Sequence, residues 1–561
     1  MCGFLGRLSP AGFCPARPLS AGLPWLARRG PDSQNFWASA SGEVEFLHAR
    51  LAIIDRTERA HQPLTADGRD VTLMFVGEIY NHRDLRAGLS EYDFRTDSDT
   101  EVILATYLKH GAAGLKRLRG MFTIAIADLE KGEVLLTRDP VGKKPLYVAQ
   151  WGEGLYFGSS LLPMRAAHDG GVALNEAAIS QFWSHEFVFP NGAIFDGARP
   201  VMPGRVERFS LSGAAQGSES CVPDDAPVWG GELFEGAEAR AGALMDRAVR
   251  RRLENNSERA VLLSGGIDST AVAAAVARVS REEGEPVRAL TLGSVIPRTN
   301  DEPWARMAAD RLDLPLRVVR PHRERLADMA ARCLDRQDEP LGMISHFTLT
   351  RLVEAIAGES RILIGGDGGD EIFLGYGGAS AWREKSGDGP APDPADWAMP
   401  MPDWFGGWAR LAVTRDLVGH GFVKADRASA EQGVEIRAPL VDWDVISYVR
   451  SLPADYVLYN GETKALLKRM LAGWPDRFIN RPKRGLTYNL RWAWLPSNYA
   501  GLREMIDPEA CDRFGAGLPT ALRGQPMTWS GRTVHANFVD VWKLAAWSAF
   551  SRRLAQAARA A

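Results

Sequence analysis

The sequence lacks the features of a disulfide-stabilised, a zinc-binding or a membrane-spanning protein. Its 561 residues include five cysteines, at positions 2, 14, 221, 333 and 511, and no two have the spacing of a metal-ligand pair. An odd, scattered set of this kind excludes a disulfide scaffold. No apolar run approaches the ~18–20 residues that span a bilayer. Because Pro10, Pro15, Pro18 and Pro24 interrupt the N-terminal segment, we expect no signal peptide and a cytoplasmic location.

An excess of charge of one sign is also absent. The chain has 67 Lys and Arg against 70 Asp and Glu, for a net charge of −3. This balance does not favour a general binder of nucleic acid or membrane surfaces, so we expect neither as a partner. The hydrophobic content of 45% and the charged content of 24% are those of an ordinary globular protein.

The hydrophobic pattern divides the chain into two parts. Strands dominate up to about residue 210, at 44–54, 72–76, 122–128 and 133–138, around a helix at 99–110 that follows a Ser98–Glu101 capping box. Beyond residue 231, helices at 234–254, 268–280, 301–313 and 345–357 alternate with strands at 260–263, 287–292, 315–319 and 361–364. This alternation predicts a parallel α/β sheet. We expect one domain at 1–208, a Gly- and Ser-rich linker at 209–231, and a second domain at 232–561 with a helical C-terminal part.

Cys2 is a candidate nucleophile. It follows the initiator Met, and removal of that Met would leave a thiol beside its own α-amine, which can act as its base. Taken alone, Cys2 would more often be an incidental small residue. The motifs that follow Cys2 in order favour a nucleophile instead; they lie at Arg29–Asp32, Arg50–Asp55, Gly77–Asn81, Asp97–Glu101 and Arg138–Tyr147.

This ordered set resembles the class II glutamine amidotransferase domain, an N-terminal-nucleophile hydrolase with an αββα sandwich, over about residues 1–208. The resemblance implies that Cys2 is the nucleophile and that the Gly77 N–H stabilises the oxyanion. It also implies a glutamine site formed by Arg50, Ile54, Gly77, Glu78 and Asp99. The chemistry suits glutamine, whose α-carboxylate needs a cation and whose α-ammonium needs an anion. A solvated Arg50, or an Asp99 that only favours a helix N-terminus, remain the plainer alternatives for each residue alone.

Two positions depart from the family pattern. Val76 stands where the family usually has an Asn that supplies the second oxyanion donor, and losing such a donor typically costs about 10²–10³ in rate. The glutaminase is therefore expected to be slow, rescued by another group, or degenerate. Ser160 stands where the family usually has Glu, and we make no prediction for its effect.

The second part of the chain carries a candidate phosphate loop. Ser264–Ser269, with the sequence SGGIDS, lies between a buried strand and an Ala-rich helix, where backbone N–H groups and the helix N-terminus can bind an anion. The loop lacks the Gly-Lys-Ser/Thr ending of a Walker motif. It matches instead the SGGxDS loop of the ATP pyrophosphatases, which cleave ATP to AMP and pyrophosphate. An acidic residue in such a loop favours Mg²⁺, and a second acidic loop, Gly365–Glu371, follows a later strand.

Together with Glu435–Asp442, Gly461–Lys464 and Arg481–Leu486, these loops resemble the synthetase domain of the glutamine-dependent asparagine synthetases over about 235–490. The resemblance implies a nucleotide site formed by Leu263, Ser264, Gly265, Gly266, Asp268, Ser269, Leu292, Gly365 and Gly366. It implies Asp268 and Asp370 as Mg²⁺ ligands and Asp367 and Lys483 as catalytic residues. Lys464 carries a weaker expectation, because charged residues are common on helix surfaces.

The sequence therefore predicts an enzyme that hydrolyses glutamine at one site. At the other it uses ATP to adenylate a carboxylate, by default aspartate, and amidates it. Expected partners are glutamine, ATP, Mg²⁺ and the acceptor; a homodimer stays open. Two alternatives also stay open: another acceptor, such as a sugar acid, a secondary metabolite or a ring-closing substrate, and an ammonia-dependent synthetase with a degenerate glutaminase. A sulfur-transferring or tRNA-modifying ATP pyrophosphatase is disfavoured, because the chain has no catalytic cysteine pair and no basic surface.

Overall fold

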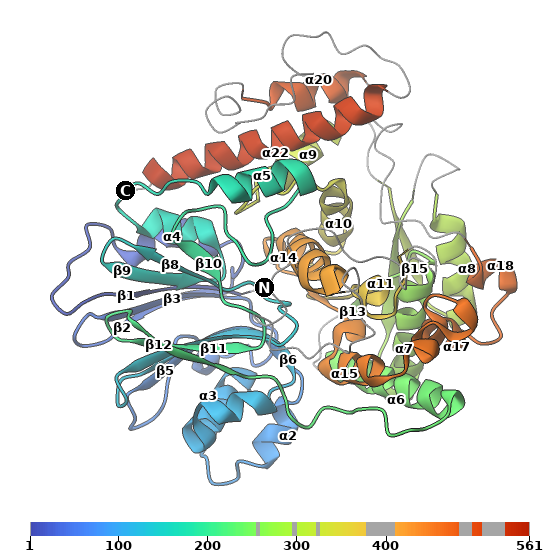
Figure 1. The fold of residues 1–561 in the computed structure, drawn as a ribbon, viewed down its shortest axis with the longest axis horizontal. Coiled ribbons are helices and arrows are strands. Elements are labelled where there is room, and N and C mark those ends of the chain that lie inside the picture. The colour runs from blue at the N-terminus through green and yellow to red at the C-terminus, as the bar shows by residue number, and fades with distance from the viewer. Residues whose placement is uncertain are drawn as a thin grey trace.

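The computed structural model describes residues 2–253, 259–293, 300–320, 326–376, 410–481, 496–507 and 533–559. These residues form two lobes that lie side by side (Figure 1). We call them the sandwich lobe (residues 2–220) and the parallel-sheet lobe (the described residues between 234 and 507). A long C-terminal helix runs along the top of the molecule in that view.

The sandwich lobe contains two antiparallel sheets stacked face to face, with strand orders β10-β8-β9-β1-β3-β2 and β12-β11-β7-β6-β5-β4. The strands are β1 (Gly3–Leu8), β2 (Ser33–Ala38), β3 (Val44–Arg50), β4 (Leu64–Thr65), β5 (Val71–Ile79), β6 (Gly120–Asp128), β7 (Glu133–Arg138), β8 (Tyr147–Trp151), β9 (Gly154–Gly158), β10 (Ala198–Pro200), β11 (Arg205–Ser210) and β12 (Ala215–Ser220). The first sheet is covered by α1 (Leu23–Leu26), α4 (Leu161–Ala167) and α5 (Glu176–His185), and the second by α2 (His82–Ala87) and α3 (Asp99–His110). The predicted αββα sandwich is confirmed.

Strand β5 of this lobe is mostly apolar because both of its faces are buried. Along β5, Met74 and Val76 lie in the core between the two sheets, whereas Leu73 and Phe75 pack in the core that includes α3. Successive side chains of a strand point to opposite faces. A strand covered on both sides therefore tends to have an apolar residue at each position, which explains the unbroken apolar run at 73–76.

Helix α3 begins where the sequence predicts, with a different cap. The Ser98 hydroxyl accepts a hydrogen bond from the Thr100 N–H at 3.2 Å. The Glu101 carboxylate does not return to Ser98, as the capping box predicts, and instead accepts from the Thr96 N–H at 2.7 Å. The Ser98 N–H already donates a hydrogen bond to the Thr96 hydroxyl at 3.2 Å. Glu101 therefore holds the chain segment that precedes the helix.

The parallel-sheet lobe has five strands in the order β15-β14-β13-β16-β17, all parallel. They are β13 (Arg259–Leu262), β14 (Val287–Leu292), β15 (Leu316–Val319), β16 (Ile362–Ile364) and β17 (Glu435–Arg437). One face packs on α6 (Phe234–Leu253), α7 (Ile267–Glu283), α8 (Glu302–Leu312) and α15 (Trp443–Ser451), and the other on α10 (Ile344–Glu354) and α14 (Val423–Ala430). The predicted strand and helix alternation is confirmed, and it brings the loops after β13 and β16 to the same edge of the sheet.

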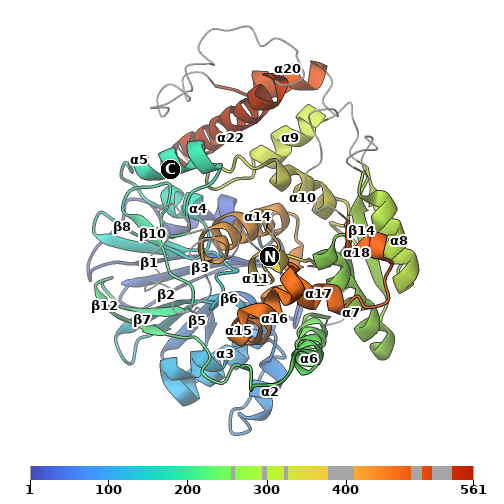
Figure 2. The same ribbon diagram turned by 45° about the vertical axis from the view of Figure 1, so that its right-hand side comes forward.

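Further helices complete the described chain: α9 (Leu326–Leu334), α11 (Gly369–Ile372), a π-helical segment (Ala412–Phe422), α16 (Ala454–Val457), α17 (Ala465–Arg469), α18 (Asp476–Ile479), α20 (Pro496–Glu504) and α22 (Thr533–Arg559). In both views α22 lies against α20 and above α5 (Figures 1 and 2). Trp547 of α22 stacks on Phe182 of α5, with ring centroids 5.7 Å apart. The C-terminal helix thus packs on the sandwich lobe. None of the described helices combines the length and apolar character of a membrane span.

The stretch predicted as a linker, 209–231, begins inside the sandwich lobe. The first half of this stretch belongs to an antiparallel hairpin of β11 and β12, in which Arg205 pairs with Ser220. Gly213 in the turn has φ +89°, a conformation that favours glycine. Part of the Gly- and Ser-rich stretch therefore forms a hairpin. The division into domains 1–208 and 232–561 stays a prediction.

Candidate functional sites

The residues predicted to bind glutamine surround one small cavity, which we call the Cys2 cavity. Its volume is about 30 Å³. Separate parts of the sandwich lobe contribute to it: the start of β1, the end of β3, the end of β5 and the start of α3. Its walls include Cys2, Arg50, Ile54, Gly77, Glu78 and Asp99. The tertiary fold thus brings the complete predicted set together.

The Cys2 thiol lies against the end of β3. The Leu51 N–H is 3.3 Å from Sγ, and Sγ is 3.6 Å from the Leu51 carbonyl oxygen. Burial raises the pKa of the Cys2 thiol, although the Leu51 N–H and the charge of Arg50 act in the opposite direction. A thiol of raised pKa is mostly protonated at neutral pH and needs a base before it can act as a nucleophile.

Arg50 is held in place by backbone carbonyl groups. Its guanidinium donates to the carbonyl oxygens of Ile54 at 3.1 Å and Thr57 at 3.2 Å, and also to that of Asp55. Burial lowers the pKa of Arg50. Carbonyl groups orient the guanidinium without cancelling its charge, so that this wall of the cavity suits a carboxylate.

The two acidic walls differ in their partners. Asp99 accepts a hydrogen bond from the Ile79 N–H at 3.0 Å, and burial raises its pKa. Glu78 forms an ion pair with Arg437 of the parallel-sheet lobe at 2.8 Å. Burial raises the pKa of Glu78, against the effect of Arg437. Glu78 therefore faces the cavity while it also joins the two lobes.

Glu435 of β17 also lines the Cys2 cavity. It accepts a hydrogen bond from the Arg437 Nε at 2.9 Å, and the Arg437 side chain is 0% exposed. The cavity therefore has a wall from the second lobe, which the sequence did not predict. Glu435 is the first residue of the motif Glu435–Asp442, for which the family resemblance implied no role.

Gly77 and Val76 have different surroundings. Gly77 has φ +142°, and an added Cβ would lie 1.9 Å from the Met121 carbonyl oxygen, so only glycine fits. Val76 is fully buried in the core between the two sheets, and its apolar side chain has no hydrogen-bond donor. Ser160, the other departure, donates a hydrogen bond to the Asp338 carboxylate.

A larger cavity of about 610 Å³ lies at the carboxyl edge of the parallel sheet. We call it the Asp268 cavity. Most of the predicted nucleotide residues line it: Leu263, Ser264, Gly266, Asp268, Ser269, Leu292 and Gly366. Gly265 and Gly365 are not among its walls. Gly265 has φ +71° and packs on the backbone of Trp304, and the Gly365 N–H donates to the Arg437 carbonyl oxygen at 2.8 Å.

Hydrogen bonds of its own serine side chains hold the phosphate loop in shape. The hydroxyl oxygens of Ser264 and Ser269 are 2.9 Å apart, and the Gly266 N–H donates to the Ser264 hydroxyl at 3.3 Å. The loop leads directly into α7, whose N-terminus carries positive potential. Such a preformed turn of N–H and hydroxyl groups suits a phosphate group.

Lys464 lies between the two predicted Mg²⁺ ligands. Its Nζ is 2.5 Å from Asp268 and 2.6 Å from Asp370. Although burial acts against it, the two carboxylates raise the pKa of Lys464. Among the described residues, no group of three or more His, Cys, Asp or Glu side chains is arranged to hold a metal ion. Asp268 and Asp370 supply carboxylate oxygens beside the phosphate loop, and these are the kind of ligand that Mg²⁺ takes together with phosphate oxygens.

The structure describes one of the two residues that we predicted to be catalytic at this cavity. Asp367 lines it, and its carboxylate pairs with Lys143 of the sandwich lobe at 3.3 Å. Lys483 lies outside the residues that the structure describes. Arg481, at the end of the described segment, also lines the cavity and pairs with Asp301 at 2.9 Å.

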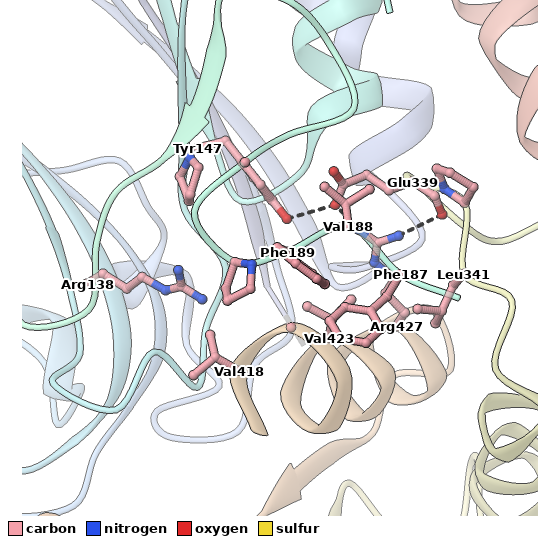
Figure 3. Close-up of a pocket in the computed structure, with 15 residues that line it drawn as sticks. Arg138, Tyr147, Phe187, Val188, Phe189, Glu339, Leu341, Val418, Val423 and Arg427 are labelled. Carbon is pink, nitrogen blue, oxygen red and sulfur yellow. Dashed lines mark hydrogen bonds and ion pairs between the residues drawn. The ribbon is translucent and has the colours of Figure 1, made fainter. Parts of the chain in front are cut away.

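Between the lobes lies a third cavity of about 20 Å³ (Figure 3). Glu339 is its polar centre, because its carboxylate accepts from the Tyr147 hydroxyl at 3.0 Å and from Arg427 at 2.8 Å. Apolar side chains from both lobes surround it, among them Phe187, Phe189, Leu341, Val418 and Val423. A buried polar cluster with its donors and acceptors matched in this way orients the lobes.

Two family models match the chain in the order of its lobes. A glutamine amidotransferase domain model matches residues 1–218, and an asparagine synthase model matches residues 240–422 and 399–513. A Bacillus subtilis protein named asparagine synthetase [glutamine-hydrolyzing] 3 is 25% identical over 511 residues, which cover 82% of each chain. A Mycobacterium tuberculosis protein named putative asparagine synthetase [glutamine-hydrolyzing] is 28% identical over 583 residues, which cover 88% of each chain.

Solved structures give a weaker likeness. A glutamine phosphoribosylpyrophosphate amidotransferase from Bacillus subtilis aligns with 57% of this chain and 81% of its own, at 14% identity and a TM-score of 0.31. The assignment depends on the two family models and on relatives that span most of the chain. The chain belongs to the family of glutamine-dependent asparagine synthetases.

Proposed function

We propose that this protein is a glutamine-hydrolysing amidotransferase that uses ATP to adenylate a carboxylate and amidates it with ammonia from glutamine. One observation carries the proposal: a single chain holds the Cys2 cavity and the Asp268 cavity, and buried ion pairs join the lobes that form them. Members of the family use ATP as a co-substrate. The names of these relatives, asparagine synthetases, support aspartate as the acceptor.

At the Cys2 cavity, the Cys2 sulfur attacks the amide carbon of glutamine, and the α-amine of Cys2 in the mature chain takes the thiol proton. The Gly77 N–H stabilises the oxyanion. Ammonia leaves with that proton, and water then hydrolyses the thioester to glutamate and restores the thiol. Arg50 binds the α-carboxylate of glutamine, Asp99 and Glu78 its α-ammonium, and Ile54 its apolar stem.

At the Asp268 cavity, an oxygen of the acceptor carboxylate attacks the α-phosphorus of ATP and pyrophosphate leaves. The loop Ser264–Ser269 binds pyrophosphate, while Leu263, Leu292 and Gly366 surround the nucleotide. Asp268 and Asp370 would hold Mg²⁺, whose charge offsets that of the phosphates when it is bound. Ammonia then attacks the acyl carbon and AMP leaves, with Asp367 and Lys483 as the catalytic residues.

The purified protein tests this proposal when it is incubated with MgATP, glutamine and a panel of carboxylates. We expect AMP, pyrophosphate and one amidated acceptor in equal amounts, and loss of all three products in Asp268→Asn and Asp370→Asn. Formation of ADP and phosphate would contradict the assignment. Growth of an asparagine auxotroph that expresses the protein separates aspartate from other acceptors, since only asparagine restores growth.

A second function, ammonia-dependent synthesis with a degenerate glutaminase, is favoured by the apolar Val76. Ammonium would then support synthesis while glutamine would not. Ammonia release from glutamine by the parent protein distinguishes the two functions, because a degenerate site would release none.

A further inference from the structure

Lys143 belongs to the sandwich lobe and lies in a rigid loop between β7 and β8. The buried Asp139 carboxylate organises this loop, because it accepts hydrogen bonds from the N–H groups of Val141 at 3.1 Å, Lys143 at 3.0 Å and Lys144 at 3.1 Å. Asp139 itself is 0% exposed. The backbone that carries Lys143 is therefore fixed from within its own lobe.

The Lys143 side chain crosses into the parallel-sheet lobe. It is 6% exposed, and its Nζ lies 3.3 Å from the Asp367 carboxylate and 4.5 Å from the centroid of the Phe422 ring. Within the described chain, Asp367 is the one carboxylate that forms an ion pair with it. A buried ammonium is costly unless it is paired. Its position therefore depends on Asp367 and on the face of the Phe422 ring.

Asp367 is held less firmly by its own loop. It follows β16 in a glycine-rich turn, and the next residue, Gly368, has φ +91°. Its side chain is 24% exposed and lines the Asp268 cavity. A second lysine, Lys424 of α14, is close enough for Asp367 to raise its pKa, although burial lowers that pKa more strongly. Lys143 is the lysine in contact with the Asp367 carboxylate.

We propose that Lys143 is a positioning residue of the synthetase reaction and holds the Asp367 carboxylate in its orientation toward the Asp268 cavity. The inference rests on the proposed function, in which Asp367 is catalytic. The role of Lys143 adds one requirement to the proposed function. Synthesis from free ammonia, which needs no glutamine, still requires a side chain from the sandwich lobe.

The test uses the full-length chain with ammonium as the nitrogen source, so that glutamine hydrolysis does not contribute. We expect Lys143→Met to lower kcat by up to about 100-fold, as small misplacements of a reacting group do, with little change in the KM for ATP. Lys143→Arg keeps the charge and should recover most of kcat. Lys131→Met, at an exposed lysine of the same lobe that pairs with Asp128, is the matched control and should leave kcat unchanged.

A double variant separates positioning from a general structural effect. Lys143→Met combined with Asp367→Asn should be no slower than Asp367→Asn alone, because Lys143 acts through Asp367. A parental kcat in folded Lys143→Met, or losses that multiply in the double variant, would overturn the proposal. If Lys143→Met does not fold, Lys143→Gln takes its place. If the parent forms neither AMP nor amide with any acceptor, the proposed function fails instead.

Discussion

The guanidinium of Arg437 lies 2.8 Å from the carboxylate of Glu78, in the buried interior between the two lobes. The backbone carbonyl of Arg437 also accepts a hydrogen bond from Gly365, the first residue of the acidic loop, at 2.8 Å. Arg437 thus contacts a wall of the Cys2 cavity through its side chain and the loop of the Asp268 cavity through its backbone. The strand β17 thus lines the Cys2 cavity through Glu435 and holds the start of the loop that lines the Asp268 cavity.

Removing this guanidinium should destabilise the folded protein. Arg437→Met removes the guanidinium that pairs with Glu78 and Glu435, although Lys144 stays 3.9 Å from Glu435, and we expect the free energy of unfolding to fall by about 3–5 kcal/mol. Adding Glu78→Gln should restore part of the loss, so that the two changes are less than additive. Urea unfolding measures these differences. Arg69→Met, in an exposed pair with Glu130, should leave the free energy of unfolding nearly unchanged. Strict additivity would contradict a direct interaction.

The Cys2 thiol is expected to serve glutamine chemistry alone. Cys2→Ala should abolish glutamine-dependent synthesis and spare ammonia-dependent synthesis, because the thiol is used only to release ammonia. Both rates are measured as AMP formation with either nitrogen source. Cys14→Ala, at an exposed cysteine, is the matched control and should keep both activities. Glutamine-dependent synthesis that survives in Cys2→Ala would rule out Cys2 as the nucleophile.

Val76→Asn should give glutamine hydrolysis a second oxyanion donor. We expect kcat for ammonia release to rise by up to about 10²-fold with little change in KM, because such a donor acts on the transition state. Val76 is fully buried, so an amide that fails to find its partner would cost about 1–3 kcal/mol of stability. Val76→Thr has the shape of valine without the reach of asparagine and should not gain activity. An unchanged kcat in folded Val76→Asn would show that another group already supplies the donor, or that the glutamine chemistry is lost for a different reason.

Acid should weaken the sandwich lobe through His48. This residue is 0% exposed, its Nε2 lies 3.0 Å from the Phe75 carbonyl oxygen, and burial lowers its pKa to about 3. The unfolded chain binds this proton first, so the stabilising contribution is complete above pH ~6.5 and is lost as the pH falls toward 3. At pH 5 the loss is roughly 2 kcal/mol. His48→Gln keeps a donor that does not titrate, and should flatten the fall in unfolding free energy between pH 7 and pH 5. An equally steep fall in the variant would show that His48 is not responsible.

The sequence by itself determined the two kinds of lobe and most of both candidate sites. Apolar runs such as 73–76 mark strands buried on both faces, and the strand and helix alternation after residue 231 marks a parallel sheet, because both patterns follow from local backbone geometry. The residues predicted to bind glutamine lie in short contiguous motifs, and all of them line the Cys2 cavity, whereas Glu435 of the other lobe lines it without having been predicted. The phosphate loop was predicted for the same reason.

Only the tertiary structure decided how the lobes complete each other's sites. Glu78 with Arg437 and Lys143 with Asp367 pair residues that are hundreds of positions apart, and no local pattern connects them. Lys464 shows the same limit: its sequence suits an exposed helix, whereas packing buries it between Asp268 and Asp370. A charged side chain carries no sequence signal for its partner. The partner is selected when two surfaces meet, because each buried charge must then find an opposite one.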